Sequence, residues 1–245
     1  ELDVHDLDLD AIQAAITPKT RAVIVNTPNN PTGRIYAPAT LERLAQILTD
    51  AGARNGRIIY IISDEAYSRI LFENKLFHSP TAYYPHTFLI YTYTKQTLAP
   101  GERLGYIALP PTMPEREALR MPISIAEVIR GHTFPTSVLQ HALPEIDKVS
   151  IDLAHLQAKR DRMIGALREM GYDVNTPEGT FYLLVRSPQA DERTFCAQLA
   201  ARKVLVMPGT AFELPGYFRI SLTANTEMIE RALPHFDAAI RNAAH

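Results

Sequence analysis

Apolar positions along the chain fall into short runs of β-branched residues and longer segments with helical spacing. The runs over 21–26, 57–63 and 87–91 are typical of strands buried in a parallel sheet. Leucines and isoleucines recur every three or four residues after the first run. This spacing predicts a helix that Thr40 caps and that ends near Gly52 to Gly56. Strand, helix and strand in this order indicate a βαβ unit. We therefore expect an α/β fold with a mostly parallel sheet.

The second half of the chain has a different pattern, with more helix and with shorter strands. A long amphipathic helix is predicted over 149–170, and Gly171 ends it. The other predicted helices cover 115–130, 135–146, 191–202 and 226–243, and the predicted strands cover 172–174, 181–185, 204–207 and 217–222.

This change of pattern places a domain boundary near residue 148. We expect residues 1–148 to form a large α/β domain and residues 149–245 a smaller α+β domain, with helix 149–170 connecting the two.

Composition narrows the function classes. The 245 residues are 46% hydrophobic and 21% charged, with a net charge of −2, which provides no basic field for nucleic acid. No apolar run reaches the roughly 20 residues that span a membrane. The single cysteine, Cys196, excludes an internal disulfide and fits a reducing cytoplasm. The chain begins without methionine, in a polar segment, so we expect a fragment of a longer protein.

Polar residues follow three of the predicted strands. Asn29 and Asn30 follow the first strand, Asp64 and Tyr67 the second, and Lys95 the third. Ligands of open α/β sheets bind at the carboxyl ends of the strands, where such residues would gather. Taken singly, a strand-end aspartate is more often a turn former, and an asparagine in a Pro/Asn/Gly loop is explained by turn chemistry.

Lys95 is the most informative of these residues. An ammonium group just past a buried strand is poorly solvated, which lowers its pKa and makes a neutral amine available to form a Schiff base with an aldehyde. Two hydroxyls, on Thr92 and Thr94, and Arg103 beyond a Pro-Gly turn are groups that a phosphate requires. The segment therefore predicts a lysine-linked pyridoxal 5'-phosphate (PLP) site. Arg219, between apolar neighbours, could by its local pattern face solvent.

Four segments together resemble one family. Asn29–Gly33 is similar to its NPTG motif, Asp64–Tyr67 to its D-x-x-Y motif, and Thr92–Gly105 to its S-x-S-K…PG-x-R-x-G motif. Phe218–Leu222 is similar to its C-terminal R-I-S strand. In this order the segments resemble the fold-type I, class I/II PLP-dependent aminotransferases, the aspartate aminotransferase superfamily, over nearly the whole chain. The resemblance implies the PLP-dependent transferase fold, with PLP bound by the large domain.

The resemblance also implies roles around the cofactor ring. Lys95 would bind PLP covalently and shuttle the proton of the substrate. Asp64 would pair with the pyridinium nitrogen, and Tyr67 and Asn30 would donate hydrogen bonds to the ring phenolate oxygen. The Asn30–Pro31 bond is expected to be cis, since the family has a tight turn there.

Further roles concern the phosphate and the substrate. Thr92 and Arg103 would bind the phosphate, and Thr94 is a weaker candidate; threonines stand where the family has serines, and their hydroxyls donate equally well. Arg219 would bind the substrate α-carboxylate in a bidentate geometry, with Asn30 beside it. No metal site is expected.

The family's N-terminal part supplies further groups to the site. A glycine-containing helix start for the phosphate, a ring stacked on the pyridine and residues lent across a dimer interface have no counterpart before Asn26. We therefore expect that an upstream segment is absent and that the protein is a homodimer with a shared active site. His132 and Glu178 are polar loop residues that are candidates for the pocket of the substrate side chain. The more common case is a loop residue whose hydrogen bonds are satisfied within the protein and that has no contact with substrate.

Three functions agree with these residues. The first is a cytoplasmic aminotransferase that acts on an α-amino acid and a 2-oxo acid. The second is another PLP reaction of an amino acid on the same scaffold, catalysed by an oxidase, lyase or cyclase. The third is the effector domain of an aminotransferase-like transcription regulator, whose DNA-binding module would lie upstream, since nothing in this chain resembles one. The motifs do not define the substrate side chain.

Overall fold

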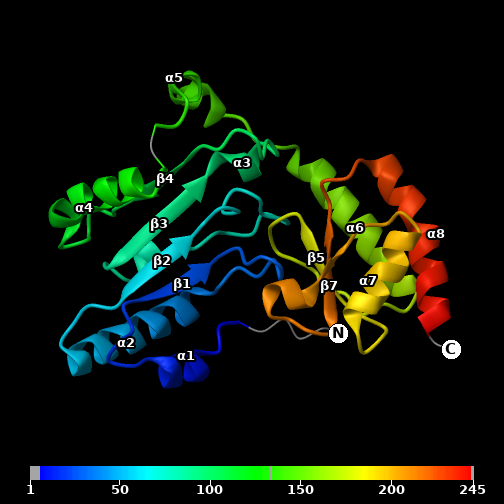
Figure 1. Cartoon of the computed structure of the whole chain (residues 1–245), viewed down its shortest axis with the longest axis horizontal. Coiled ribbons are helices and arrows are strands. Elements are labelled where there is room, and N and C mark those ends of the chain that lie inside the picture. The colour runs from blue at the N-terminus through cyan, green and yellow to red at the C-terminus, as the bar shows by residue number, and fades with distance from the viewer. Residues whose placement is uncertain (1–5, 133, 244–245) are drawn as a thin grey trace.

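The chain folds around two β-sheets (Figure 1). The computed structural model describes residues 6–132 and 134–243. The first sheet has the order β1 (Ala22–Asn26), β2 (Tyr60–Asp64), β3 (Thr87–Thr92) and β4 (Gly105–Ala108). Strands β1 to β3 are parallel, and β4 is antiparallel to β3. The second sheet is antiparallel, with the order β5 (Tyr182–Arg186), β7 (Tyr217–Ser221) and β6 (Met207–Pro208). The predicted α/β fold with a mostly parallel sheet is confirmed.

Helices surround both sheets. The first sheet has α2 along one side, and α6, α7 and α8 gather beside the second sheet (Figure 1). The helices are α1 (Leu9–Ala15), α2 (Pro38–Asn55), α3 (Tyr93–Gln96), α4 (Arg116–Ile129), α5 (Ser137–Ile146), α6 (Leu153–Glu169), α7 (Glu192–Ala201) and α8 (Thr226–Ala243), with 3₁₀ turns η1 (Pro80–Ala82) and η2 (Gly209–Phe212). Among the described residues, no helix is long and apolar enough to cross a membrane.

Two predicted helix starts were wrong. Helix α2 begins at Pro38, before Thr40, because proline is favoured in the first helical turn, where no amide hydrogen is needed. The Thr40 hydroxyl instead donates to Asp6 Oδ2 at 2.7 Å. Helix α6 begins at Leu153 rather than 149, because the Asp152 carboxylate accepts from the His155 amide and caps the helix there.

Two predicted strands are shorter than expected, for the same reason. The Tyr172 amide donates to Leu167 O (2.9 Å) and closes the last turn of α6, which leaves one bridge at Val174 in place of a strand over 172–174. The Val204 amide donates to Leu199 O (3.0 Å) after α7, and β6 begins only at Met207. In each of the two segments, the first backbone amide donates to the preceding helix. That amide is therefore not available for pairing with a strand.

The hydrophobic core has two parts. In one, the buried leucines of α2 pack against Val25 and Ile61 of the first sheet and against Ile59 just before β2. The other joins α6, α7 and α8 to β5 and β7. This second core also contains Tyr67, Ile70 and Phe72, from the segment after β2. The segment after β2 is therefore shared between the two halves of the chain, and the division at residue 148 stays a prediction.

Candidate active site

The carboxyl ends of the three parallel strands share one edge of the first sheet. Asn26 at the end of β1 lies opposite Asp64 at the end of β2. Asp64 lies opposite Ile90, two residues before the end of β3 at Thr92. Neighbouring strands lie about 4.8 Å apart. The structure thus gathers the three predicted polar clusters at a single edge.

Asn30 is held to this edge by Asn26. The Asn30 amide donates to Asn26 Oδ1 at 2.6 Å, and Asn26 Nδ2 donates to the Asp64 carbonyl at 3.1 Å. The Asn30–Pro31 bond is cis, as predicted, and so is Thr27–Pro28. Sequence reasoning missed Asn26, although an amide side chain as the last residue of an apolar strand is a usable signal.

Arg219 reaches Asn30 from the second sheet. Its Nη1 donates to Asn30 Oδ1 at 2.8 Å. The guanidinium carbon lies 4.0 Å from the ring centroid of Tyr182 and 4.3 Å from that of Phe212. Both distances fit cation–π contacts. Burial lowers the pKa of Arg219. The local pattern around Arg219 allowed it to face solvent, but the side chain lies between two rings and points to the site edge.

Tyr67 lies between the two sheets and is 4% exposed. Its ring centroid is 5.5 Å from that of Phe181 and 5.9 Å from that of Tyr182. Burial, and then the neighbouring Tyr182, raise the pKa of Tyr67, and Arg219 opposes the shift. The phenol therefore stays protonated at neutral pH and can donate a hydrogen bond.

Lys95 extends from α3 toward Tyr67. Its Nζ lies 5.8 Å from the centroid of the Tyr67 ring. The lysine is half-buried, and its short helix is capped by Thr92, whose hydroxyl accepts from the Thr94 amide at 3.4 Å. The structure therefore brings together the amine of Lys95 and the phenol of Tyr67.

The predicted phosphate ligands come together only in part. The hydroxyls of Thr92 and Thr94 lie 3.0 Å apart. Arg103 is exposed, with φ +45°, and its Nη1 donates to Pro100 O of its own turn at 3.4 Å. Gly105, two residues later, pairs with Thr92, and a Cβ there would lie 2.4 Å from Tyr91 O. The glycine therefore allows this turn to approach the end of β3, but the guanidinium does not contact the hydroxyls.

Asp64 forms the turn that was weighed from sequence, and its role toward a cofactor stays a prediction. Its Oδ1 accepts from the Ala66 amide at 3.2 Å, as a turn-forming aspartate does. Among residues 6–132 and 134–243, its Oδ2 accepts no hydrogen bond. The carboxylate is half-buried at the site edge, so one oxygen is available to a ligand.

The two loop candidates differ in position. His132 is exposed on the turn after α4, where its amide donates to Glu127 O at 2.9 Å. Glu178 is half-buried, and its carboxylate accepts from the Ile35 amide at 3.0 Å, so its hydrogen bonds are satisfied, as sequence reasoning favoured. Sequence reasoning missed Tyr182 and Phe212 because nothing local marks an aromatic residue that will lie on a distant arginine.

Comparison with known proteins agrees with this arrangement. Residues 3–236 match the family "Aminotransferase class I and II". The chain belongs to this family. It is 30% identical over 246 residues to the aspartate/prephenate aminotransferase of Thermus thermophilus, covering 96% of this chain and 60% of that protein. It is 31% identical to a probable aspartate aminotransferase of Methanocaldococcus jannaschii, covering 93% of this chain and 60% of that protein.

Solved structures of this family superimpose closely on the chain. An amino transferase from Eubacterium rectale matches with a TM-score of 0.92 at 30% identity, over 98% of this chain and 60% of that one. The aspartate aminotransferase of Thermotoga maritima matches with a TM-score of 0.81 at 28% identity, over 96% of this chain and 60% of that one. The chain thus spans about 60% of the length of these relatives.

Proposed function

We propose that this chain carries the catalytic residues of a PLP-dependent aminotransferase, which moves an amino group between an α-amino acid and a 2-oxo acid. The observation that supports it most is the Arg219–Asn30 hydrogen bond (2.8 Å). Through it, a carboxylate-binding group of the second sheet reaches the edge where Lys95 and Asp64 lie.

The side chains at this edge fit PLP. They offer an amine for the aldehyde, a carboxylate oxygen for the ring nitrogen, a phenol and an amide for the phenolate oxygen, and paired hydroxyls for the phosphate. Lys95, Asp64, Tyr67, Asn30, Thr92 and Thr94 would hold the cofactor in this way. Arg103 fits less well, because its guanidinium donates to Pro100 O within its own turn and does not contact the paired hydroxyls. PLP, when bound, supplies an electron sink for the bonds at the substrate α-carbon.

The chain's own groups perform the proton chemistry. Lys95 Nζ, with the apolar rings of Tyr67 and its neighbours beside it, is the base that takes and returns a proton at the substrate α-carbon. Tyr67 holds its phenolic proton at neutral pH because its pKa is raised, so it acts as a hydrogen-bond donor rather than a base. Asp64 stays an acceptor at its free oxygen, which favours a protonated ring nitrogen.

Arg219 orients the substrate. Its guanidinium is desolvated between Tyr182 and Phe212, where a carboxylate gains more from pairing than it does in water. One nitrogen is committed to Asn30, so the substrate carboxylate is fixed relative to Asn30 as well. A planar guanidinium can bind both carboxylate oxygens at once, which the point charge of a lysine cannot do.

We also propose an amino donor, an oligomeric state and a location for this activity. Because the similar proteins include aspartate aminotransferases, L-aspartate is the first amino donor to test. The family resemblance supports a homodimer with a shared active site in the cytoplasm and two domains divided near residue 148. Nucleic acid and membrane are not proposed as partners, given the net charge of −2.

Product analysis tests the proposal. The wild-type chain with PLP, L-aspartate and 2-oxoglutarate should form L-glutamate, and Lys95→Ala should lower kcat by about 10⁴-fold or more. Lys19→Ala, which changes an exposed lysine, is the matched control and should leave kcat unchanged. Retained turnover in Lys95→Ala would refute the role of the lysine. A 2-oxo acid that forms without any 2-oxo acid acceptor would indicate an oxidase or a lyase instead.

A further inference from the structure

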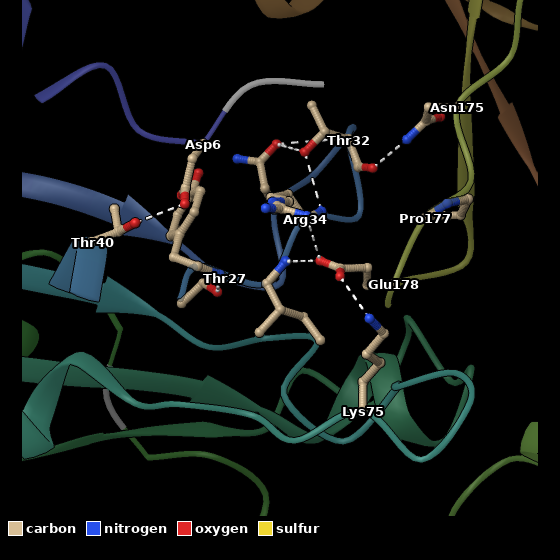
Figure 2. Close-up of polar contacts among 12 residues, drawn as sticks. Asp6, Thr27, Thr32, Arg34, Thr40, Lys75, Asn175, Pro177 and Glu178 are labelled. Carbon is tan, nitrogen blue, oxygen red and sulfur yellow. Dashed lines mark hydrogen bonds and ion pairs between the residues drawn. The ribbon is translucent and has the colours of Figure 1, made fainter. Parts of the chain in front are cut away.

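Asn30 and Tyr67 lie on separate segments that one loop joins. Asn30 belongs to the turn over 27–36, and Tyr67 begins the segment over 67–75. The loop over 174–180, between α6 and β5, contacts both segments (Figure 2). The position of these two side chains relative to each other therefore depends on this loop.

On the first side, the loop binds the turn that carries Asn30. Glu178 and Gly179 both donate their amides to Gly33 O, at 3.1 and 3.0 Å. Asn175 Nδ2 donates to the Thr32 carbonyl (Figure 2). Gly33 has φ +71°, and a Cβ there would lie 2.2 Å from Pro177 Cβ, so only glycine permits this close packing.

On the second side, the same loop binds the segment after Tyr67. The Phe72 amide donates to Glu178 O at 2.9 Å, and the Thr180 amide donates to Ile70 O at 3.0 Å. The Ile70 amide in turn donates to Tyr67 O at 2.8 Å. The main chain of the loop therefore connects within two hydrogen bonds to Tyr67.

The Glu178 carboxylate connects the two sides directly. Its Oε2 accepts from the Ile35 amide at 3.0 Å and from Arg34 Nη1 at 3.4 Å. Its Oε1 lies 3.2 Å from Lys75 Nζ (Figure 2). Two cations and one amide from both segments thus meet on one carboxylate that is 21% exposed.

The loop that carries Glu178 is itself fixed to α6. Arg160, which is 2% exposed, donates from Nη1 to Pro177 O at 3.0 Å. Arg168 Nη2 donates to Val174 O at 3.1 Å and to Thr176 Oγ1 at 2.9 Å. Because the loop and the Tyr67 segment both belong to the second core, Glu178 holds the Asn30 turn against a fixed support.

We propose that Glu178 is a positioning residue of the active site, whose carboxylate sets the distance between the Asn30 turn and the Tyr67 segment. The inference rests on the proposed function, in which Asn30 and Tyr67 both donate to the phenolate oxygen of PLP. Glu178 does not touch the cofactor. It acts through the two donors.

The first measurement needs no cofactor. Amide hydrogen exchange, followed by mass spectrometry on the chain without PLP, should show exchange about tenfold faster over 27–36 in Glu178→Ala. Peptides from β5 and β7 should be unchanged. Glu178→Gln keeps an acceptor for the Ile35 amide but presents a neutral amide to Lys75 and Arg34, so its effect should have the same direction and be smaller.

The second measurement distinguishes positioning from stability alone. In the PLP-loaded protein, the pH midpoint of the lysine–PLP absorbance should rise by about half a unit in Glu178→Ala, because weaker donation destabilises the anionic phenolate oxygen. Glu73→Gln is the matched control: it removes the charge of Glu73 on the 67–75 segment but keeps an acceptor for Arg160, so that the Arg160–Pro177 anchor of the loop stays in place. This control should lower stability and leave the midpoint unchanged.

Two results would overturn the proposal. The first is unchanged exchange over 27–36 in Glu178→Ala, and the second is a pH midpoint that moves equally in Glu178→Ala and Glu73→Gln. A wild-type protein that takes up no PLP would refute the proposed function instead, and the exchange measurement would still decide for or against Glu178.

Discussion

The two sheets of this chain are covered to different degrees. Strand β5 is buried from Tyr182 to Val185, and Phe218 on β7 is 0% exposed. In the first sheet, α2 covers one face, whereas on the other face Ile24 of β1 is 73% exposed and Ile107 of β4 is 38% exposed. Parallel sheets normally have both faces covered. The first sheet is therefore covered on one face only, whereas β5 and the Phe218 and Ile220 side of β7 lie in a closed core.

This difference shows how the site is built. The open sheet supplies the polar edge, with Asp64, Lys95 and the Asn30 turn. The closed half supplies Arg219, the rings around it and the loop that carries Glu178. The half with the second core thus supports Arg219 and the Glu178 loop, and the first sheet carries the polar residues at its strand ends.

The largest expected effect is on the free energy of unfolding, and it tests whether the two sheets are packed differently. Phe218→Ala should cost about 3–5 kcal/mol of unfolding free energy, because a buried ring leaves a cavity among Tyr172, Phe195 and Phe236. Ile24→Ala should change it by no more than about 0.5 kcal/mol, because the side chain is exposed. Urea unfolding of both variants measures the contrast. Equal losses would show that the two sheets are packed alike in solution.

The next effect is on substrate binding, and it tests the contact of Arg219 on the second sheet with Asn30 at the edge of the first. Arg219→Lys should raise the KM for L-aspartate about 100-fold, which corresponds to about 2.7 kcal/mol, because both the bidentate contact and the Asn30 bond are lost. Arg162→Lys, at an exposed arginine paired with Glu230, is the control and should leave KM unchanged. Steady-state kinetics with both variants measure the difference. A normal KM in Arg219→Lys would mean that the carboxylate binds elsewhere.

The smallest effect concerns pH and the open sheet. Glu65 is buried after β2, and burial raises its pKa above the ordinary 4.5, although Ser63 and Ser79 donate to it. The ionised carboxylate is thus the less favourable form in the folded state, and its cost appears as pH rises through the raised pKa.

Glu65→Gln removes this charge and keeps an acceptor for both serines. Its Tm should exceed that of the wild type by a few degrees at pH 7, and the gain should vanish below pH 4.5, where the wild-type carboxyl is protonated. Calorimetric Tm values at both pH values decide the matter. A gain that is equal at both pH values would mean that the charge of Glu65 is not its cause.

Much of the fold could be predicted from the sequence because periodicity is local. The strands over 22–26, 60–64 and 87–92 and the helix between the first two of them follow from apolar spacing and turn residues. Strand-end polarity also indicated the site edge. The cap of α2 was wrong because Pro38 begins the helix before Thr40.

The contacts between the halves could not be predicted in this way. Arg219 and Asn30 are 189 positions apart, and no local pattern joins them. The conformation of Arg103, which donates to its own turn, and the role of Glu178 depend likewise on tertiary packing. The direction of these side chains depends on the residues that they contact, and those residues lie elsewhere in the sequence.

The most direct test of the proposed function is to locate the cofactor on the chain. The protein is incubated with PLP, reduced with borohydride, digested and mapped by mass spectrometry. The account predicts one phosphopyridoxyl-lysine, at Lys95, with labelling abolished in Lys95→Ala and retained in Lys19→Ala. Labelling that is absent at Lys95, or spread equally over surface lysines, would contradict it.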